Sequence, residues 1–234
     1  MAPLYRELNH DFFKSWSSDM GYVLGYFAAD GTMIKSRRGG HFIEFDSIDK
    51  VLIQQVRAAM KSSHHIGVRR RDLKNKNWKT AYRLQVGSIK MFNDLQKLGF
   101  TQKKSLTIKF PTIPDKYFSD FVRGYFDGDG NVYFKKHYAK DRKQKRWVFS
   151  SRFTSGCKQF LIDLHSSLGK HGIKGGFILS NKERRGFNLV MSHLDSLALH
   201  KLMYNTAPDT SLYLPRKYKL FRKALKTMYP EMRA

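Results

Sequence analysis

The sequence predicts an α+β fold in which one structural unit occurs twice. Two segments, MGYVLGYFAADGTM at 20–33 and SDFVRGYFDGDGNV at 119–132, share the skeleton V-x-G-Y-F-x-[AG]-D-G. Their aspartates, Asp30 and Asp129, are 99 residues apart. The same succession of strand and helix patterns follows each segment. We therefore expect a unit of helix, strand, strand, helix, strand, strand and helix, used in tandem.

In the first copy, alternating and apolar residues indicate the strands, with the turn signal Gly39-Gly40 between the first two. Apolar residues on one side, such as Leu52 and Val56, indicate an amphipathic helix. The elements expected after the motif are strands at 32–38 and 41–47, a helix at 49–62, strands at 66–72 and 80–87, and a helix at 89–98. Gly99 is a suitable residue to end the last helix.

The second copy repeats this order and adds a basic helix at the end of the chain. The elements expected after its motif are strands at 131–138 and 146–154, a helix at 157–169, strands at 173–180 and 186–191, and helices at 193–204 and 216–228. Pro111 and Pro114 mark the connection between the copies. We therefore expect a first repeat at 1–99, a linker at 100–114 and a second repeat at 115–234.

The charge of the chain indicates an anionic partner. Lys and Arg outnumber Asp and Glu by 44 to 19, which gives a net charge of +25 among 234 residues. Such an excess is self-repelling, and a polyanion compensates it. The basic residues concentrate at 69–83 and 135–146, where aromatic residues are interleaved with them. This pattern favours nucleic acid over anionic lipid or a merely soluble basic protein.

The remaining composition limits the compartment and the kinds of site. Cys157 is the single cysteine, which excludes intrachain disulfides and multi-cysteine zinc sites. No apolar run reaches the roughly 18 residues of a spanning helix, and the N-terminus lacks the apolar core of a secretory signal. We expect an intracellular protein of the cytoplasm, the nucleoid or an organelle, neither secreted nor membrane-bound.

Small residues recur every four positions along both motif helices. Gly21, Gly25 and Ala29 form one stripe, and Gly124 and Gly128 form the matching one. Because an interior glycine costs a helix about 0.5–1 kcal/mol relative to alanine, these glycines indicate that the two helix backbones approach closely.

Close packing does not account for the acids that end the motif helices. A carboxylate at a helix C-terminus is unfavourable by about 0.3–1 kcal/mol, and pairing the helices would bring Asp30 and Asp129 together. A cation between two such carboxylates relieves their repulsion. Carboxylate, carbonyl and water oxygens are the ligands of Mg²⁺. In a basic chain, this set of ligands points to metal-dependent phosphodiester chemistry on nucleic acid.

The motifs resemble those of the LAGLIDADG homing endonucleases of the single-chain, two-motif type. Their letters map onto Val23–Gly31 and Val122–Gly130, and the resemblance extends over about 20–225. It implies a DNA-binding saddle of two αββαββα halves, each with a four-stranded, mostly antiparallel sheet across the major groove. The two motif helices would form the central interface.

The resemblance also implies the roles of individual residues. Asp30 and Asp129 would bind catalytic Mg²⁺, with Mn²⁺ and Ca²⁺ as alternative occupants, and Ala29 and Gly128 would lend backbone carbonyls. The family places a lysine near the metals in each repeat, which implies catalytic roles for Lys104 and Lys217. An alternative for both lysines is ordinary phosphate binding, because they lie in charge-rich segments.

The first motif departs from the family pattern at one letter. Ala28 stands where Asp127 supplies an acid in the second motif. That acid is associated with stabilising the helix ends rather than with binding metal, so the departure is compatible with activity. The two halves differ, which suits an asymmetric target.

Recognition of DNA is expected on the side chains that alternation directs away from the helices. Arginine pairs with guanine and Gln or Asn pairs with adenine, while several lysines are expected to contact phosphate alone. The expected DNA-binding residues are Lys35, Arg37, Glu44, Arg69, Arg71, Arg83, Gln85, Lys135, Arg152, Ser180, Lys182 and Asn188.

The sequence therefore supports the hypothesis of a monomeric, magnesium-dependent endodeoxyribonuclease that cleaves both strands of a long asymmetric site and requires no protein partner. Two alternatives keep the fold. One is an RNA maturase that assists the folding of a cognate intron RNA. The other is a DNA-binding regulator that does not cleave.

Overall fold

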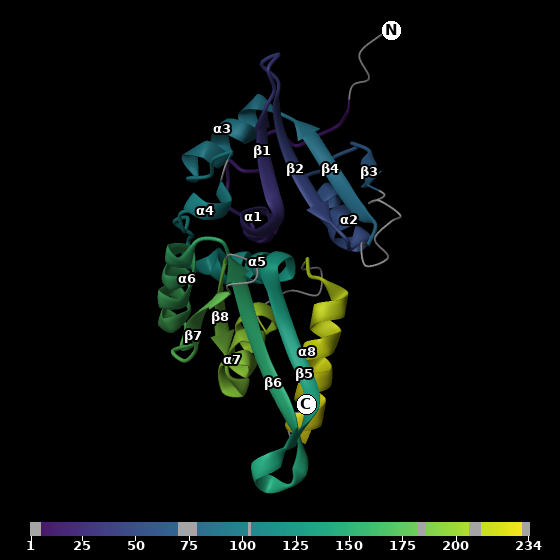
Figure 1. Ribbon diagram of the computed structural model, residues 1–234. Helices are drawn as coiled ribbons and strands as arrows, with labels where there is room; N and C mark the ends of the chain where they lie inside the picture. Colours follow the sequence, from purple (N-terminus) through teal and green to yellow (C-terminus); the bar gives the residue numbers. More distant parts are fainter. Residues whose placement is uncertain (1–5, 70–78, 103, 182–185, 206–211, 231–234) are drawn as a thin grey trace. The chain divides into compact units, whose positions relative to one another are not determined.

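The computed structural model describes residues 6–69, 79–102, 104–181, 186–205 and 212–230. The chain divides into two compact units, Met1–Gly128 and Asp129–Ala234 (Figure 1). The helix of the second motif thus belongs to the first unit up to Gly128. This division concerns packing, and the expected repeat boundaries, 1–99 and 115–234, remain a prediction.

The first unit contains both motif helices and one sheet. Its elements are α1 (Ser18–Asp30), β1 (Gly31–Lys35), β2 (His41–Ser47), α2 (Lys50–Ala59), β3 (Ile66–Arg69), β4 (Ala81–Gly87), α3 (Ile89–Lys97), α4 (Lys104–Thr107), a 3-10 turn (Asp115–Tyr117) and α5 (Phe118–Asp129). Serines begin two of the helices, because the Ser17 and Ser88 hydroxyls accept hydrogen bonds from the backbone N–H groups of Met20 and Met91.

The second unit starts at the residue that ends α5. Its elements are β5 (Gly130–Ala139), a 3-10 turn (Lys140–Arg142), β6 (Gln144–Ser155), α6 (Lys158–Lys170), β7 (Phe177–Asn181), β8 (Gly186–Met191), α7 (His193–Tyr204) and α8 (Pro215–Met228). The strands β5 and β6 form a long hairpin, and α8 packs beside β5 (Figure 1).

The two sheets have the same topology. The strand orders are β1-β2-β4-β3 and β5-β6-β8-β7, and every neighbouring pair is antiparallel. The predicted α+β class with duplicated αββαββα halves is confirmed. The short helix α4 lies in the segment expected to be a linker.

Glycines shorten two of the predicted strands. The first strand ends at Lys35 rather than at 38, because the chain turns through Gly39 at φ +82° and Ser36 donates its N–H to the carbonyl of Gly40. The strand expected from 173 starts only at Phe177, because Gly172 and Gly176 adopt positive φ. The strand expected at 66–72 is described as far as Arg69.

The core of the first unit lies between its sheet and its helices. Met33, Ile43, Phe45, Leu84 and Val86 alternate along β1, β2 and β4 and are buried. The helices α1, α2 and α3 pack against this side of the sheet. The residues that alternate with these point to the other side of the sheet. In each of the two sheets, we call the side that faces away from the helices the open face. In the described part of the chain, no helix is long and apolar enough to cross a membrane.

Candidate active site and nucleic-acid interface

The two motif helices touch backbone to backbone at their glycines. A Cβ atom on Gly25 would lie 2.0 Å from the carbonyl oxygen of Phe121, and one on Gly124 would lie 1.9 Å from the carbonyl oxygen of Tyr22. Such separations leave no room for any side chain. The close approach predicted from the glycine stripes is therefore confirmed.

A buried hydrogen bond accounts for the departure of the first motif at Ala28. The Tyr22 hydroxyl of α1 donates to Oδ2 of Asp127 on α5 at 2.8 Å. In the motif alignment, Tyr22 corresponds to Phe121, and Asp127 corresponds to Ala28. One pair is polar and its counterpart is apolar. Phe121 has no hydroxyl that could bond an acid at position 28, so alanine fits there.

The second motif helix carries a further buried charge pair. Nη2 of Arg123 lies 2.5 Å from Oδ1 of Asp120, and both side chains are almost fully buried. The guanidinium also lies over the Tyr22 ring, 5.7 Å from its centroid. Partial burial raises the pKa of Asp19, and the charge of Asp120 raises it further. The corresponding residues of the first motif, Gly21 and Leu24, carry no charge.

The motif acid Asp30 is exposed at the end of α1, next to the glycine stripe of α5. A Cβ on Gly128 would lie 3.4 Å from Oδ2 of Asp30 and 2.4 Å from Cβ of Ala29. Burial raises the pKa of Tyr26 well above its usual value, and the negative charge of Asp30 adds to this shift. The Asp30 carboxylate therefore lies where α1 and α5 meet.

The other motif acid, Asp129, is half-buried and ends α5 immediately before β5. Both acids present hard oxygen donors at helix ends, which fits Mg²⁺. In the described residues, no three His, Cys, Asp or Glu side chains form a cluster suited to a metal. The chain would thus supply Mg²⁺ with one or two carboxylates, and backbone carbonyls, water and phosphate oxygens would complete the set.

One of the two predicted catalytic lysines lies next to the second motif. Lys217, in the first turn of α8, is buried and lines a pocket of about 420 Å³ together with Asn131 and Val132 of β5. These strand residues follow Asp129 closely in the chain, so Lys217 lies at the start of β5. The backbone of Lys104 is in α4, and its side chain lies outside the described residues.

Four predicted DNA-binding residues lie together on the open face of the first sheet. Glu44 is opposite Gln85, and Arg83 is opposite Asp46, and facing residues of antiparallel strands point to the same side. Arg69 is opposite Ala81, which lies two residues before Arg83 on β4. Arg69 and Arg83 therefore lie on the same face of the sheet. Arg71 and Lys182 lie outside the described residues.

Two residues expected on an open face lie on the helix side instead. Lys35 is opposite His41, in phase with buried Met33 and Ile43. Ser180 is opposite Phe187, in phase with buried Leu189. The prediction that both side chains point to the open face was wrong. The side of the sheet that a residue faces is set by its pairing with the neighbouring strand, and the expected limits of a strand do not contain this pairing.

Arg37 lies in the turn after β1, outside the strand expected to carry it.

The remaining candidates lie on the open face of the second sheet. Lys135 is opposite Val148, Arg152 is opposite Asn131, and Asn188 is opposite Thr154. The Thr154 hydroxyl donates to Oδ1 of Asn188 at 2.9 Å. The strands β5 to β8 contain no Asp or Glu. The strand residues of this face are therefore either basic or uncharged.

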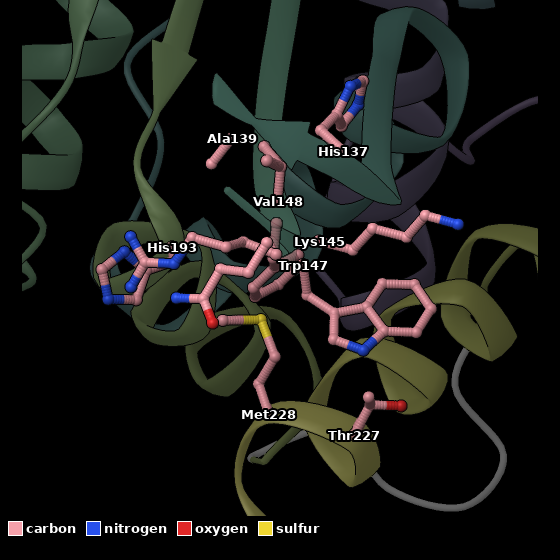
Figure 2. Close-up of a pocket in the computed structure, with 11 residues that line it drawn as sticks. His137, Ala139, Lys145, Trp147, Val148, His193, Thr227 and Met228 are labelled. Carbon is pink, nitrogen blue, oxygen red and sulfur yellow. The ribbon is translucent and has the colours of Figure 1, made fainter. Parts of the chain in front are cut away.

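The basic cluster at 135–146 forms the hairpin of β5 and β6. A pocket of about 680 Å³ lies beside this hairpin, between Lys145, Trp147 and Val148 of β6 and His193 and Met228 of the helices α7 and α8 (Figure 2). Neither motif acid lines this pocket.

The alternation pattern did not single out Asp46. Its position two residues after Glu44 on the same strand was the available signal. The contacts of Tyr22 and Arg123 could not be predicted from the motif alignment, because they join residues that the alignment does not pair.

Comparison with known proteins agrees with this geometry. Residues 17–98 match the family model of the LAGLIDADG-like domain. This stretch is similar to a LAGLIDADG-like domain. The match covers α1 to α3, which is the first of the two copies. The resemblance to the LAGLIDADG family expected from the motifs is confirmed.

Solved LAGLIDADG structures share the fold of the whole chain. The homing endonuclease I-WcaI bound to its DNA recognition sequence is 16% identical, with a TM-score of 0.61 over 94% of both chains. I-SmaMI bound to uncleaved DNA target with calcium ions is 9% identical, with a TM-score of 0.59 over 93% of both chains. I-LtrWI bound to target DNA is 12% identical, with a TM-score of 0.56 over 94% of this chain and 92% of its own.

A curated relative is the DNA-directed RNA polymerase subunit Rpo1C of Methanocaldococcus jannaschii. It is 24% identical over 185 residues, which is 78% of this chain and 19% of the relative. The chain thus spans about a fifth of the length of that relative.

Proposed function

We propose that the chain is a site-specific homing endonuclease that hydrolyses both strands of a long asymmetric DNA site with a divalent metal. The observation that supports this proposal best is the placement of the motif acids. Asp30 and Asp129 end two helices that pack through glycines, and the Asp30 carboxylate lies next to Gly128 of the other helix.

In this proposal, Asp30 and Asp129 hold Mg²⁺, Mn²⁺ or Ca²⁺ through carboxylate oxygens, and Ala29 and Gly128 contribute backbone carbonyls. When bound, the metal supplies Lewis acidity and an activated water at the scissile phosphate. Lys217 of α8, which lines a pocket with the first residues of β5, would donate a hydrogen bond from its ammonium group to the attacking water and so stabilise the negative charge that develops on that water. Lys104 has the matching role in the first repeat.

The two open faces contribute DNA binding. A net charge of +25 compensates the phosphates, and the different side chains on the two sheets suit an asymmetric target. Both motifs are present in one chain, so we propose that a monomer suffices. Because many phosphate contacts release counterions, binding should weaken steeply as salt rises.

The test separates binding from cleavage. A duplex selected by binding from a randomised library is incubated with Mg²⁺ and with the wild type, Asp30→Asn, Asp129→Asn or the double variant. We expect cleavage to be lost in the variants while binding in Ca²⁺ is retained. Asp163→Asn, at a half-buried acid of α6 that accepts a hydrogen bond from Gln159, is the matched control and should cleave normally.

Full cleavage by the double variant would overturn the metal assignment. Binding of a cognate intron RNA without any DNA cleavage would support the maturase alternative, and selective DNA binding without cleavage by the wild type would support the regulator.

A further inference from the structure

We propose that Glu44 and Asp46 are positioning residues that hold Arg83 and Arg69 as a preassembled reader of guanine on the open face of the first sheet. This inference rests on the proposed function in one respect, namely that the ligand is duplex DNA. We infer that this face reads guanine and that its two acids prevent indiscriminate binding of phosphate.

The register gathers the four charged groups at one place. Asp46 lies opposite Arg83 on β4, and Arg83 lies opposite Gly67 on β3. Because Gly67 has no side chain, the neighbouring Arg69 can reach across toward β2. Both acids of β2 are therefore within reach of both guanidinium groups.

The distances show that each acid is shared by both arginines. Nε of Arg83 lies 3.2 Å from Oε1 of Glu44 and 3.6 Å from Oδ1 of Asp46. Nη2 of Arg69 lies 3.6 Å from the same Glu44 oxygen, and Nη1 lies 3.8 Å from Oδ2 of Asp46. The two acids therefore restrain both guanidinium groups.

These ion pairs leave hydrogen-bond donors unused. The contacts restrain the arginines by charge, and the buried Nε of Arg83 and Oδ1 of Asp46 make no hydrogen bond. Arg83 approaches both acids through Nε, so the two Nη groups lie at the other end of the guanidinium. A guanidinium with two parallel donors matches O6 and N7 of guanine in the major groove.

Glu44 is anchored on its other oxygen. Its Oε2 accepts a hydrogen bond of 3.0 Å from Nε2 of Gln85, the residue directly opposite. The Glu44 side chain is only 7% exposed. Burial and the nearby Asp46 raise the pKa of Glu44, while Arg69 and Gln85 act in the opposite direction. The carboxylate is thus fixed in place and depends on its basic neighbours.

The same acids disfavour phosphate. Two carboxylates and two guanidinium groups sum to zero charge, and a phosphate approaching Arg83 would meet both acids at short range. The edge of guanine presents neutral acceptors and avoids this repulsion. The open face of the second sheet contains no acid on its strands. Selection of a base edge over phosphate is therefore built into the first sheet.

The test is a binding selection from a randomised duplex library in Ca²⁺, with the wild type and three variants. The wild type should enrich guanine at one or two neighbouring positions of one half-site. Arg83→Lys keeps the charge and removes the fork, so preference at one of those positions should fall about tenfold or more. Glu44→Gln and Asp46→Asn should relax the same positions and raise binding to unrelated duplexes.

The matched control is Arg57→Lys in α2, which packs on the other side of the same sheet. It should leave the enriched sequence unchanged. Thermal unfolding by circular dichroism verifies that each variant is folded. The inference is overturned if the three variants change affinity for all sequences equally and keep the enriched bases, or if the wild type binds without preference. Selective binding without any cleavage would overturn the proposed function and leave this inference standing.

Discussion

The two copies of the repeat share a topology and differ in how they handle charge. The first sheet holds its arginines with Glu44 and Asp46, whereas the strands of the second sheet carry no acid. The motif helices show the reverse, because α1 is apolar where α5 buries Arg123 and Asp120. Duplication has thus preserved strand order and register while polar side chains diverged. We propose that this divergence separates base recognition on the first sheet from general attraction to phosphate on the second.

The largest effect should come from the feature that the copies share. Gly25→Ala and Gly124→Ala each place a Cβ within about 2 Å of a backbone carbonyl of the other helix. The helices would have to separate, and we expect a loss of at least about 3 kcal/mol in the free energy of unfolding. Urea denaturation measures this loss.

Gly169→Ala in α6 is the control, because a Cβ there meets nothing within 4 Å. It should stabilise the protein by about 0.5–1 kcal/mol. Equal effects at Gly25, Gly124 and Gly169 would show that the helices do not depend on close contact.

The buried charge pair gives the next largest effect. Asp120→Ala leaves the Arg123 guanidinium without the carboxylate at 2.5 Å, which should cost about 3–5 kcal/mol of unfolding free energy. The double variant Asp120→Gly, Arg123→Leu installs the residues of the first copy. It should be more stable than Asp120→Ala alone, as measured by urea denaturation, and the opposite order would contradict a charge-specific cost.

The stability of the second unit should depend on pH through His200. Burial lowers the pKa of His200 from 6.5 to about 4, and the charge of Arg222 adds to this shift. The ring packs among Tyr204, Tyr218 and Phe221. Between pH 6.5 and 4, His200 is protonated in the unfolded state and neutral in the folded state. The free energy of unfolding should therefore fall as the pH drops from 6.5 toward 4, by about 3 kcal/mol in total.

His200→Phe should remove this part of the pH dependence of urea unfolding. A variant with the same slope between pH 6.5 and 4 as the wild type would exclude His200 as its source.

The smallest effect concerns the hydrogen bond that joins the motif helices. Tyr22→Phe removes the donor to Asp127 and should cost about 1–3 kcal/mol, because the acid stays buried. The double variant Tyr22→Phe, Asp127→Ala installs the apolar residues that the motif alignment places at these positions, Phe121 and Ala28. A double-mutant cycle by urea denaturation should show that the two changes together cost less than the sum of their separate costs, and strict additivity would contradict the direct contact.

Local pattern and internal repetition were sufficient to predict most of the fold. The strand β2 and the helix α7 lie at the predicted residues, because alternation and amphipathic periodicity are local signals. The glycine stripes predicted the backbone contact for the same reason.

Features set by pairing between distant residues could not be predicted in this way. Lys35 and Ser180 point to the helix side because of cross-strand register. Asp46 joins the arginine network through β3 and β4, which are distant in sequence. Tyr22 meets Asp127 across two repeats, whereas the motif alignment pairs each residue with its counterpart.

We propose that this chain cuts DNA at one sequence with a divalent metal. The most direct measurement is incubation of the purified chain with a randomised duplex library and Mg²⁺, followed by sequencing of the cut ends. We expect cut ends in both strands at one asymmetric sequence, and we expect them to disappear when EDTA replaces Mg²⁺. Intact duplexes in Mg²⁺, or cut ends that persist in EDTA, would contradict it.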